Sequence, residues 1–483
     1  MKDETKLKVD GAPHSDMDDV YEAVEGKGTY KYIVLLAATL AFLTHMFFLF
    51  AVPYFLILPT ARCYKSGDWK ECTESEICSD EEPIMPYYLD KPVEFNFITE
   101  LDWYCKKFEP AFYTASSFFA GTTVSVILVT GISDALGRMP LLIIGVSGNI
   151  LAIVFFMFYT TPITCLITSF LVGFFTMANN STSFNFLADS VPKKYREIYP
   201  SVMNTGWALG EIVLALIMWT GVHWRIMAFV MVVFAASFFI PIIWLRESPK
   251  FYFSKNQLFK AKRRLKNMAN VNRVKARDIQ LISPGTISDK QEEVSFSKRL
   301  KLACCDKYML LQVIIITVLF SIGNMVFYAV SLNLENMSAN PYVNGISLAI
   351  AEIAAYAISA VTLNKLGMKV SLLGSFAFTT IGLAGLIFYW EDEIPCLIFA
   401  FTTKFGSAAI DNLLYTMSGL VFPTEILGAA LGIALLGTRI GNALAKPLME
   451  FGYEIICGIM LGLSVSGIFL VLFIKPKKKE NED

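Results

Sequence analysis

Five ionisable residues lie inside long apolar stretches of the chain, where a charge is expensive. They are Glu211, Glu352, Lys404, Asp411 and Arg439. An ionisable side chain at the centre of a membrane helix costs roughly 2.5 to 3.5 kcal/mol on insertion scales, so each one should face an aqueous cavity or a partner. Because the set carries both signs, the chemistry it favours is the binding of a small charged or zwitterionic molecule.

Helical spacing groups these charges with aromatic residues. Lys404 and Asp411 are seven residues apart, and Tyr415 follows Asp411 by four, so the three share a helical face. A guanidinium binds a carboxylate through two parallel hydrogen bonds, which makes Arg439 the expected partner of an anionic group, while acidic side chains balance an ammonium. Aromatic rings add cation–π contacts to a quaternary amine, and the candidates are Phe320, Phe327, Tyr328 and Tyr415.

Structural interpretations of the same residues stay open at this point. Asp411 and Arg439 have opposite charges and would also suit an internal salt bridge. Lys404 lies near the middle of its segment only if the segment boundaries hold, and its long side chain can otherwise extend to the membrane surface. Glu211, four residues after Trp207, is either a cavity or proton-coupling residue or a polar contact between helices.

The elements that must position these residues are apolar segments long enough to span a bilayer. The chain has 483 residues, is 55% hydrophobic and only 17% charged. A membrane helix needs about 20 apolar residues, and the sequence predicts twelve such spans, an all-α membrane protein. They lie near 33–57, 110–131, 140–159, 163–186, 202–222, 226–245, 309–333, 345–364, 370–390, 395–420, 427–448 and 453–474.

Charge asymmetry predicts the orientation of these spans. Residues 246–308 contain sixteen Lys and Arg, whereas the loop 58–109 contains twelve Asp and Glu against six Lys and Arg. By the positive-inside rule the basic stretch and both termini are expected in the cytoplasm. The predicted divisions are a cytoplasmic N-terminus 1–32, a six-helix half 33–245 with the extracellular loop 58–109, a basic linker 246–308, a second half 309–474 and a cytoplasmic tail 475–483.

The acidic loop also predicts covalent modification. It contains four cysteines, which an oxidising compartment would join as two disulfides in one of three connectivities: Cys63, Cys72, Cys78 and Cys105. Asn336, in Asn-Met-Ser, is a glycosylation acceptor in a predicted outside loop.

A charged turn follows the second span. Gly131 permits close helix approach, and Asp134 and Arg138 lie four residues apart, where they can pair with charges at neighbouring helix ends. We expect this turn to form a latch on the cytoplasmic side. The full set of expected gating residues is Gly131, Asp134, Gly137, Arg138, Asp189, Arg196 and Glu247.

The turn and several other motifs resemble a known family. The pattern G-x-x-x-D-x-x-G-R stands where the major facilitator superfamily places it, between the second and third of twelve spans. Four segments are similar to solute carrier family 22, the organic cation, carnitine and organic anion transporters: 100–105 (Glu-Leu-Asp-Trp-Tyr-Cys), 195–196 (Tyr-Arg), 223–225 (His-Trp-Arg) and 247–251 (Glu-Ser-Pro-Lys-Phe). The resemblance implies the major facilitator fold and a plasma-membrane transporter that works by alternating access. The first loop is shorter than in that family. The counterpart of the turn motif in the second half, 364–368 (Asn-Lys-Leu-Gly-Met), departs from the family pattern.

Within the family, individual residues point to a substrate class. Arg439 resembles the position where anion and carnitine transporters have Arg, and Glu352 resembles the Glu of cation and carnitine members. Lys404 and the stretch 327–332 look most like the carnitine branch, while Asp411 departs from the family pattern. The expected substrate is a zwitterion or cation such as carnitine, a betaine or an amino-acid derivative. The alternatives are an organic anion transporter using Arg439 and Lys404, and a receptor or scaffold that does not transport.

Other functional classes find no support in the sequence. There is no G-x-x-x-x-G-K-[ST] loop, no Cys/His zinc spacing and no H-E-x-x-H, so we expect neither an enzyme nor a cofactor or metal site. The expected partners are a small organic ion and membrane lipid, without nucleic acid. The coupling ion and the mode of transport stay open.

Overall fold

The computed structural model describes most of the helical part of the chain. The described residues are 20–22, 24, 28–57, 61–65, 68–72, 87–89, 97–100, 103, 112–158, 161–192, 195, 198–274, 307–334, 337, 340–422, 424–449 and 451–474.

Long helices make up nearly all of this part. They are α2 (Thr29–Phe55), α6 (Ser117–Leu136, preceded by a π-helical turn η2, Phe112–Ser116), α7 (Arg138–Met157), α8 (Pro162–Ser190), α9 (Ile198–Trp219), α10 (Trp224–Ser237, extended by α11, Phe239–Ile242), α15 (Lys307–Ser331), α16 (Pro341–Leu366), α17 (Met368–Tyr389), α18 (Glu393–Val421), α19 (Thr424–Met449) and α20 (Tyr453–Leu472). Within the described ranges, 11 segments are long and apolar enough to cross a membrane. With α19, these helices match the twelve predicted spans, and the all-α membrane fold is confirmed.

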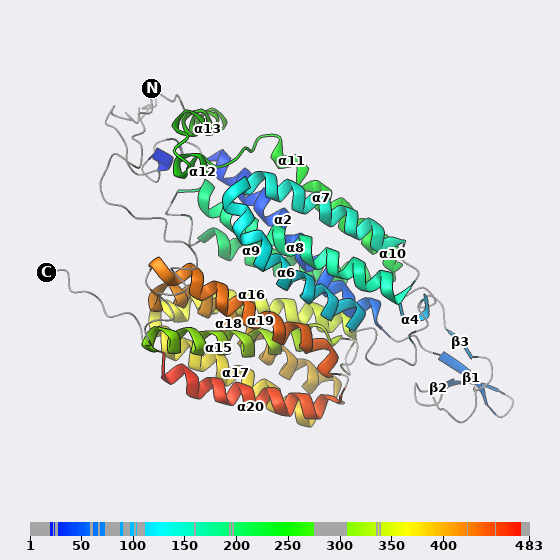
Figure 1. The fold of residues 1–483 in the computed structure, drawn as a ribbon. Helices are drawn as coiled ribbons and strands as arrows, with labels where there is room; N and C mark the ends of the chain where they lie inside the picture. Colours follow the sequence, from blue (N-terminus) through cyan, green and yellow to red (C-terminus); the bar gives the residue numbers. More distant parts are fainter. Residues whose placement is uncertain are drawn as a thin grey trace, which may run out of the picture.

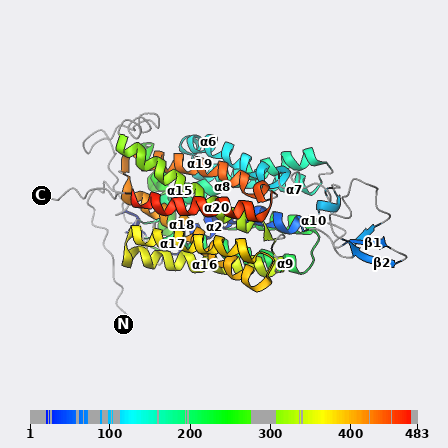
Figure 2. The same ribbon diagram turned by 90° about the horizontal axis from the view of Figure 1, so that it is seen from below.

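The helices pack as two groups that lie beside one another (Figures 1 and 2). In the first group, α8 packs against α2, α6 and α7, and α10 packs against α2 and α7. In the second, α17 packs against α18 and α20, and α15 packs against α18 and α19. The groups meet where α9 contacts α16 and where α6 and η2 contact α19. Residues on α9, α16 and α19 therefore lie close to this junction, and so does Lys404 on α18, whose ammonium is 5.3 Å from the Phe50 ring of α2.

Local sequence explains where several helices begin and end. Gly137 separates α6 from α7 with φ 96°, and Gly367 separates α16 from α17 with φ 80°, a backbone region that L side chains rarely adopt. Thr161 caps α8: its hydroxyl accepts a hydrogen bond from the Thr164 amide in a capping box, and Pro162 occupies the first helical position.

A small antiparallel sheet marks one end of the bundle, which we call the sheet end (Figure 1). Its strands are β1 (Ala61–Lys65), β2 (Asp68–Cys72) and β3 (Tyr87–Leu89), in the order β2-β1-β3. Cys63 is buried and disulfide-bonded, and its backbone lies opposite Lys70, while Cys72 lies opposite Ala61. Which cysteine forms the disulfide with Cys63 stays a prediction. Cys78 and Cys105 lie outside the described residues.

Two short helices, α12 (Pro249–Ser254) and α13 (Leu258–Val271), mark the opposite end, which we call the α13 end. The Asn272 amide fastens α13 to the start of α2: its Oδ1 accepts from the Tyr30 backbone N at 2.7 Å, and its Nδ2 donates to the Val24 carbonyl at 2.9 Å. Tyr21 is buried here, and its hydroxyl donates to the Asp189 carbonyl at 2.7 Å.

Candidate functional site

Lys404 lies at the centre of a buried polar cluster. Its ammonium nitrogen is 3.1 Å from Glu352 Oε2, and both side chains are 0% exposed. The same nitrogen donates to Ser331 Oγ at 2.7 Å and stands 3.2 Å from the centre of the Phe327 ring. The other Glu352 oxygen accepts a hydrogen bond from the Tyr356 hydroxyl at 2.6 Å. The ammonium is therefore held inside the bundle and does not extend to a membrane surface.

Glu211 reaches this cluster from the other helix group. It lies on α9, and its Oε1 accepts a hydrogen bond from Trp207 Nε1 at 3.0 Å, the i to i+4 contact that the spacing allows. Its carboxyl group also interacts electrostatically with the Glu352 carboxyl group and with Lys404. Glu211 thus contributes a buried acidic group at the junction of the two groups.

Arg439 is a second buried cation of the second helix group, and its surroundings differ sharply. Its side chain, on α19, is only 8% exposed. The guanidinium reaches across the junction, where Nη2 contacts Met177 Sδ on α8 at 3.5 Å, and its Nε has no hydrogen-bond partner. Among the described residues it forms no ion pair. A buried guanidinium without a counter-charge is costly and calls for an explanation.

Asp411 is not the ion-pair partner of Arg439. Its Oδ1 accepts a hydrogen bond from Asn324 Nδ2 at 2.7 Å, which ties α18 to α15. The two charges are near enough to interact electrostatically, yet no direct contact joins them. The internal salt bridge that the sequence left open is therefore absent between these two described residues.

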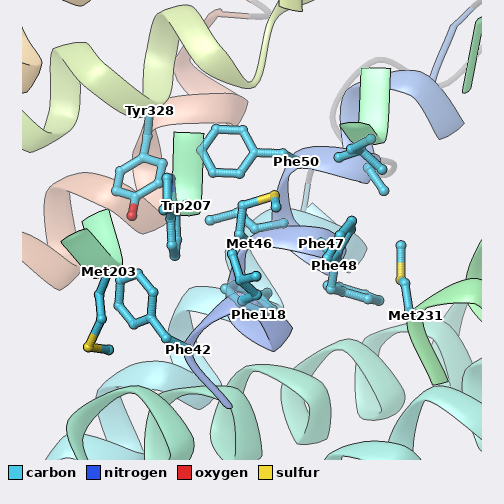
Figure 3. Close-up of a cluster of buried hydrophobic side chains, with 14 of the residues drawn as sticks. Phe42, Met46, Phe47, Phe48, Phe50, Phe118, Met203, Trp207, Met231 and Tyr328 are labelled. Atoms are coloured by element: carbon cyan, nitrogen blue, oxygen red, sulfur yellow. The ribbon is translucent and has the colours of Figure 1, made fainter. Parts of the chain in front are cut away.

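Aromatic rings line the space between the two groups (Figure 3). Tyr328 packs edge-on against Phe119 with ring centres 5.1 Å apart, and the Phe50 ring contacts both Tyr328, at 6.4 Å, and Trp207, at 5.7 Å. Phe320 and Tyr415 form another edge-on pair at 5.1 Å. Phe320 is fully buried, whereas the Tyr415 ring is 45% exposed, so Tyr415 is the one of the two that a ligand can reach.

Sequence reasoning missed several of the residues that shape this region. Asn324 and Ser331 are neutral polar residues in an apolar helix, and a search for charges passes over them. Met177 and Phe50 look like ordinary core residues in the sequence. Phe327 was expected to contact a substrate cation, but its face is occupied by the Lys404 ammonium.

Uncharged contacts close the junction at the sheet end. The Tyr342 ring stacks on Tyr54 at 5.4 Å and on Trp219 at 6.1 Å, joining α16 to α2 and α9. Ser116 donates a hydrogen bond to the Ala443 carbonyl at 2.7 Å, joining η2 to α19.

The predicted latch residues at the α13 end lie largely within the first group. Arg138 Nε contacts Asp189 Oδ2 at 3.1 Å, and its Nη1 donates to the Ser133 carbonyl at 2.8 Å. Gly131 and Asp134 lie on α6, and Arg196 lies outside the described residues. In this state the turn therefore connects the ends of α6, α7 and α8.

Glu247 also stabilises this group of helix ends. Its Oε2 accepts from the Met139 backbone N and its Oε1 from the Ser248 backbone N, both at 2.9 Å, so it caps the start of α7. Burial raises the pKa of this carboxyl group, and the two backbone donors oppose that rise. A side chain at Gly137 would collide with Glu247, and the equivalent Gly367 faces open space.

A charged cluster joins the end of the first loop to the bundle at the sheet end. Arg225 Nη1 and Nη2 each donate to one oxygen of Glu100 at 2.8 Å, a bidentate pair. His223 Nδ1 accepts from the Arg225 backbone N at 3.1 Å and caps α10. The pKa of His223 is lowered, first by burial and then by Arg225, while Glu100 opposes the shift.

Comparisons with known proteins agree with this architecture. Residues 108–446 match the family model of the Major Facilitator Superfamily. In solved structures, the proton:xylose symporter XylE bound to 6-bromo-6-deoxy-D-glucose superposes with a TM-score of 0.62 at 16% identity, covering 93% of this chain and 97% of that one. The inward-open conformation of XylE from E. coli gives 0.63 at 14% identity, covering 93% and 98%. At such identities these likenesses show the fold alone.

Curated relatives narrow the family. A solute carrier family 22 member 15-like protein from Xenopus laevis is 26% identical over 366 residues, 72% of this chain and 74% of the relative. Organic cation/carnitine transporter 4 from Arabidopsis thaliana is 25% identical over 361 residues, covering 71% and 68%. Organic cation/carnitine transporter 2 from Mus musculus is 24% identical over 405 residues, covering 79% and 68%. The chain therefore belongs to the Major Facilitator Superfamily and, within it, to the multi-pass transporters of solute carrier family 22.

Proposed function

We propose that this transporter carries a small organic zwitterion or cation, of the carnitine, betaine or amino-acid-derivative type, by alternating access. The observation that carries the proposal is Arg439: a buried guanidinium at the helix junction, without an ion pair among the described residues. A substrate carboxylate would supply the missing charge and bind two guanidinium nitrogens at once. The printed names of two relatives, organic cation/carnitine transporters, agree with such a substrate.

The cationic end of the substrate requires a negative and aromatic environment. Asp411 supplies the charge, and Asn324 holds its carboxylate in place at 2.7 Å. Tyr415, one helical turn further along α18, presents an accessible ring for a cation–π contact. Lys404 and Glu352 neutralise each other, so we assign them to the framework of the site and the substrate to Arg439 and Asp411.

The alternating-access mechanism would use the two helix groups as rocking halves, 33–245 and 309–474, joined by the linker 246–308. We place the sheet end outside the cell and the α13 end in the cytoplasm, following the charge asymmetry of the loops. The contacts among Tyr54, Trp219 and Tyr342 then hold the extracellular side closed. Opening this side would require those rings to separate.

We extend the proposal to the remaining predictions. Asn336, which lies outside the described residues, would carry a glycan on the exterior, and the loop cysteines would be oxidised there, as Cys63 already is. Both termini would lie in the cytoplasm of a plasma-membrane protein. Arg138, Asp189 and Glu247 would stiffen the cytoplasmic ends of the first half while the second half moves against it.

An organic anion is the second candidate substrate, because an unpaired guanidinium also suits a simple carboxylate. That alternative was expected to use Lys404 together with Arg439. The Lys404 charge is already matched by Glu352 at 3.1 Å, which leaves Arg439 alone of these two cations to bind the anion. Asp411 would then repel the substrate, so we favour the zwitterion.

Uptake by expressing cells tests these assignments. The labelled panel contains carnitine as the zwitterion, tetraethylammonium as the cation and benzoate as the anion. We expect carnitine to accumulate, Arg439→Gln to abolish its accumulation, and the exposed Lys262→Gln to leave it unchanged. Accumulation of benzoate alone would replace the zwitterion by the anion. The absence of uptake for all three, with normal surface expression, would reject the proposed substrate class.

A further inference from the structure

Helix α13 has a strongly basic surface that the transport site does not use. Its sequence contains five Lys and Arg and no Asp or Glu. It follows α12 in the linker, so these charges lie outside the apolar membrane segments. Figure 1 shows α13 at the outer edge of the first helix group, on the side away from the second group. One side of the helix can therefore contact a partner outside the bundle.

The inner face of α13 is fixed to the bundle. Its buried side chains recur at helical spacing: Ala261, Leu265, Met268 and Ala269. Asn272, directly after the helix, forms the two hydrogen bonds to the backbone around the start of α2 that are described above. The rotation of α13 about its axis is therefore set by these contacts, and so is the face that it turns outward.

The outward face combines one aromatic ring with two cations, and we call Phe259, Arg263 and Lys266 the α13 patch. The Phe259 side chain is 81% exposed. Arg263 and Lys266 follow it by four and seven residues, so they lie on the same face, and both are exposed. Neither side chain forms an ion pair, hydrogen bond or ring contact with another described residue. Lys260 and Arg264 differ, because each lies 5.7 Å from the centre of one tyrosine ring of α12.

The chain reaches α13 from a helix whose outer surface suits contact with lipid. Exposed apolar side chains run along α10 and α11 and continue to Ile243 and Trp244, which are 66% and 53% exposed. Tryptophan is common where acyl chains give way to headgroups. The chain then enters α12 at Pro249, and α13 follows. An amphipathic basic helix at this level can place an aromatic ring among the headgroups and its cations beside them.

We propose that the α13 patch binds anionic lipid headgroups at the surface of the membrane. The Phe259 ring enters the boundary between headgroups and acyl chains, and Arg263 and Lys266 contact the negatively charged headgroup oxygens. Charge complementarity selects this occupant, because the cytoplasmic leaflet is negatively charged and α13 has no acidic residue that would repel it. The choice of leaflet rests on the orientation proposed above. The binding site itself depends on neither the orientation nor the substrate.

The test measures which lipid lies beside α13. A fluorescent noncanonical amino acid replaces Asn270, an exposed residue on the same face as Phe259. The full-length protein is placed in nanodiscs of mixed phosphatidylcholine and phosphatidylserine, in which a small fraction of one lipid or the other carries an acceptor dye on its acyl chain. We expect several times more energy transfer to labelled phosphatidylserine than to labelled phosphatidylcholine. The preference should decrease at high salt, because salt screens the attraction.

Variants of exposed residues separate the two parts of the patch. Each basic side chain near an anionic surface changes the affinity about fivefold, so Arg263→Gln or Lys266→Gln should remove most of the preference and the double variant all of it. Phe259→Ala keeps the charges, so transfer to both lipids should fall while the preference remains. The matched control combines Lys307→Gln with Lys365→Gln, which removes two exposed charges from the α13 end of the second group and should leave the preference unchanged.

Equal transfer to the two lipids in the wild-type protein would overturn the proposal, and so would a preference that the control lowers as much as the double variant does. Weak transfer to both lipids would also overturn it, because the patch would then lie away from the bilayer and suit an acidic protein segment. The substrate assignment fails separately, since the nanodiscs contain no substrate. A lipid preference that requires the patch, together with no uptake of the labelled panel, would reject the zwitterion and retain the lipid site.

Discussion

Lys404 and Arg439 are both buried cations in the second helix group, but only one of them has a counter-charge. Lys404 contacts a carboxylate, a hydroxyl and the face of an aromatic ring. Arg439 contacts a methionine sulfur and has an unpaired Nε. Burial alone therefore does not distinguish a structural charge from one that binds a ligand. The two kinds of charge differ in whether the protein itself supplies a counter-charge.

Energetics explain why the difference matters. Breaking a buried ion pair leaves an uncompensated charge, whereas removing a charge that has no partner relieves the protein of a cost. Lys404 should therefore be needed for folding. Arg439 should be needed for binding a ligand whose negative charge pairs with the guanidinium. The predictions below test this contrast, starting with the largest effect.

Lys404→Met should lower the free energy of unfolding by about 3–5 kcal/mol, because Glu352 is left buried without its ammonium. Thermal unfolding in detergent, followed by the fluorescence of a thiol-reactive dye, measures the change. The double variant Lys404→Met with Glu352→Gln should regain most of the stability. A single variant as stable as the wild type would remove the structural role that we give to Lys404.

Arg439→Gln should reduce uptake of the preferred substrate at least tenfold while the protein remains as stable as the wild type. Charge-assisted hydrogen bonds are worth about 1.5–3 kcal/mol each, and a tenfold change corresponds to about 1.4 kcal/mol. Initial uptake rates and thermal unfolding are measured on the same variant. If its stability drops as far as that of Lys404→Met, Arg439 is structural and the contrast fails.

Phe327→Leu should destabilise the protein by about 1–2 kcal/mol more than Phe376→Leu. Both rings are buried, but only Phe327 lies under an ammonium, 3.2 Å from its centre. The comparison cancels most of the cost of shortening a buried ring. Equal losses of stability in the two variants would mean that the cation–π contact adds nothing to the Lys404 cluster.

A partly exposed charge cluster should show the smallest effect. Burial lowers the pKa of His223, so the stability it contributes is present above its ordinary pKa and is lost as the pH falls through the lowered value. Protonating Nδ1 also removes the acceptor that caps α10. His223→Asn keeps an acceptor and should lack this acid-dependent loss in thermal unfolding. Parallel pH profiles for the variant and the wild type would contradict this account.

Much of the fold was predictable because apolar segments of the right length are visible in the sequence. The predicted spans 163–186 and 395–420 correspond to α8, Pro162–Ser190, and α18, Glu393–Val421. The differences lie at the ends, where capping residues and polar side chains continue a helix beyond its apolar part. The strands of the first loop were not predicted, because their five-residue and three-residue lengths leave little pattern to detect.

The candidate site was predictable in its residues but not in its pairing. Glu211, Glu352, Lys404, Asp411 and Arg439 stand out because a charge in an apolar helix is rare. Which acid meets which base depends on the rotation and depth of each helix, and these follow from tertiary packing. Lys404 therefore pairs with Glu352, and Asp411 with Asn324, although the sequence equally allowed an Asp411–Arg439 bridge.

The three rings that close the sheet end carry no formal charge. Tyr54, Tyr342 and Trp219 are held by apolar surface and ring quadrupoles, which dissolved ions screen very little. The rate at which this side opens should therefore depend strongly on temperature and hardly at all on ionic strength. The activation barrier to opening the sheet end should therefore be the same in dilute and in concentrated salt solution.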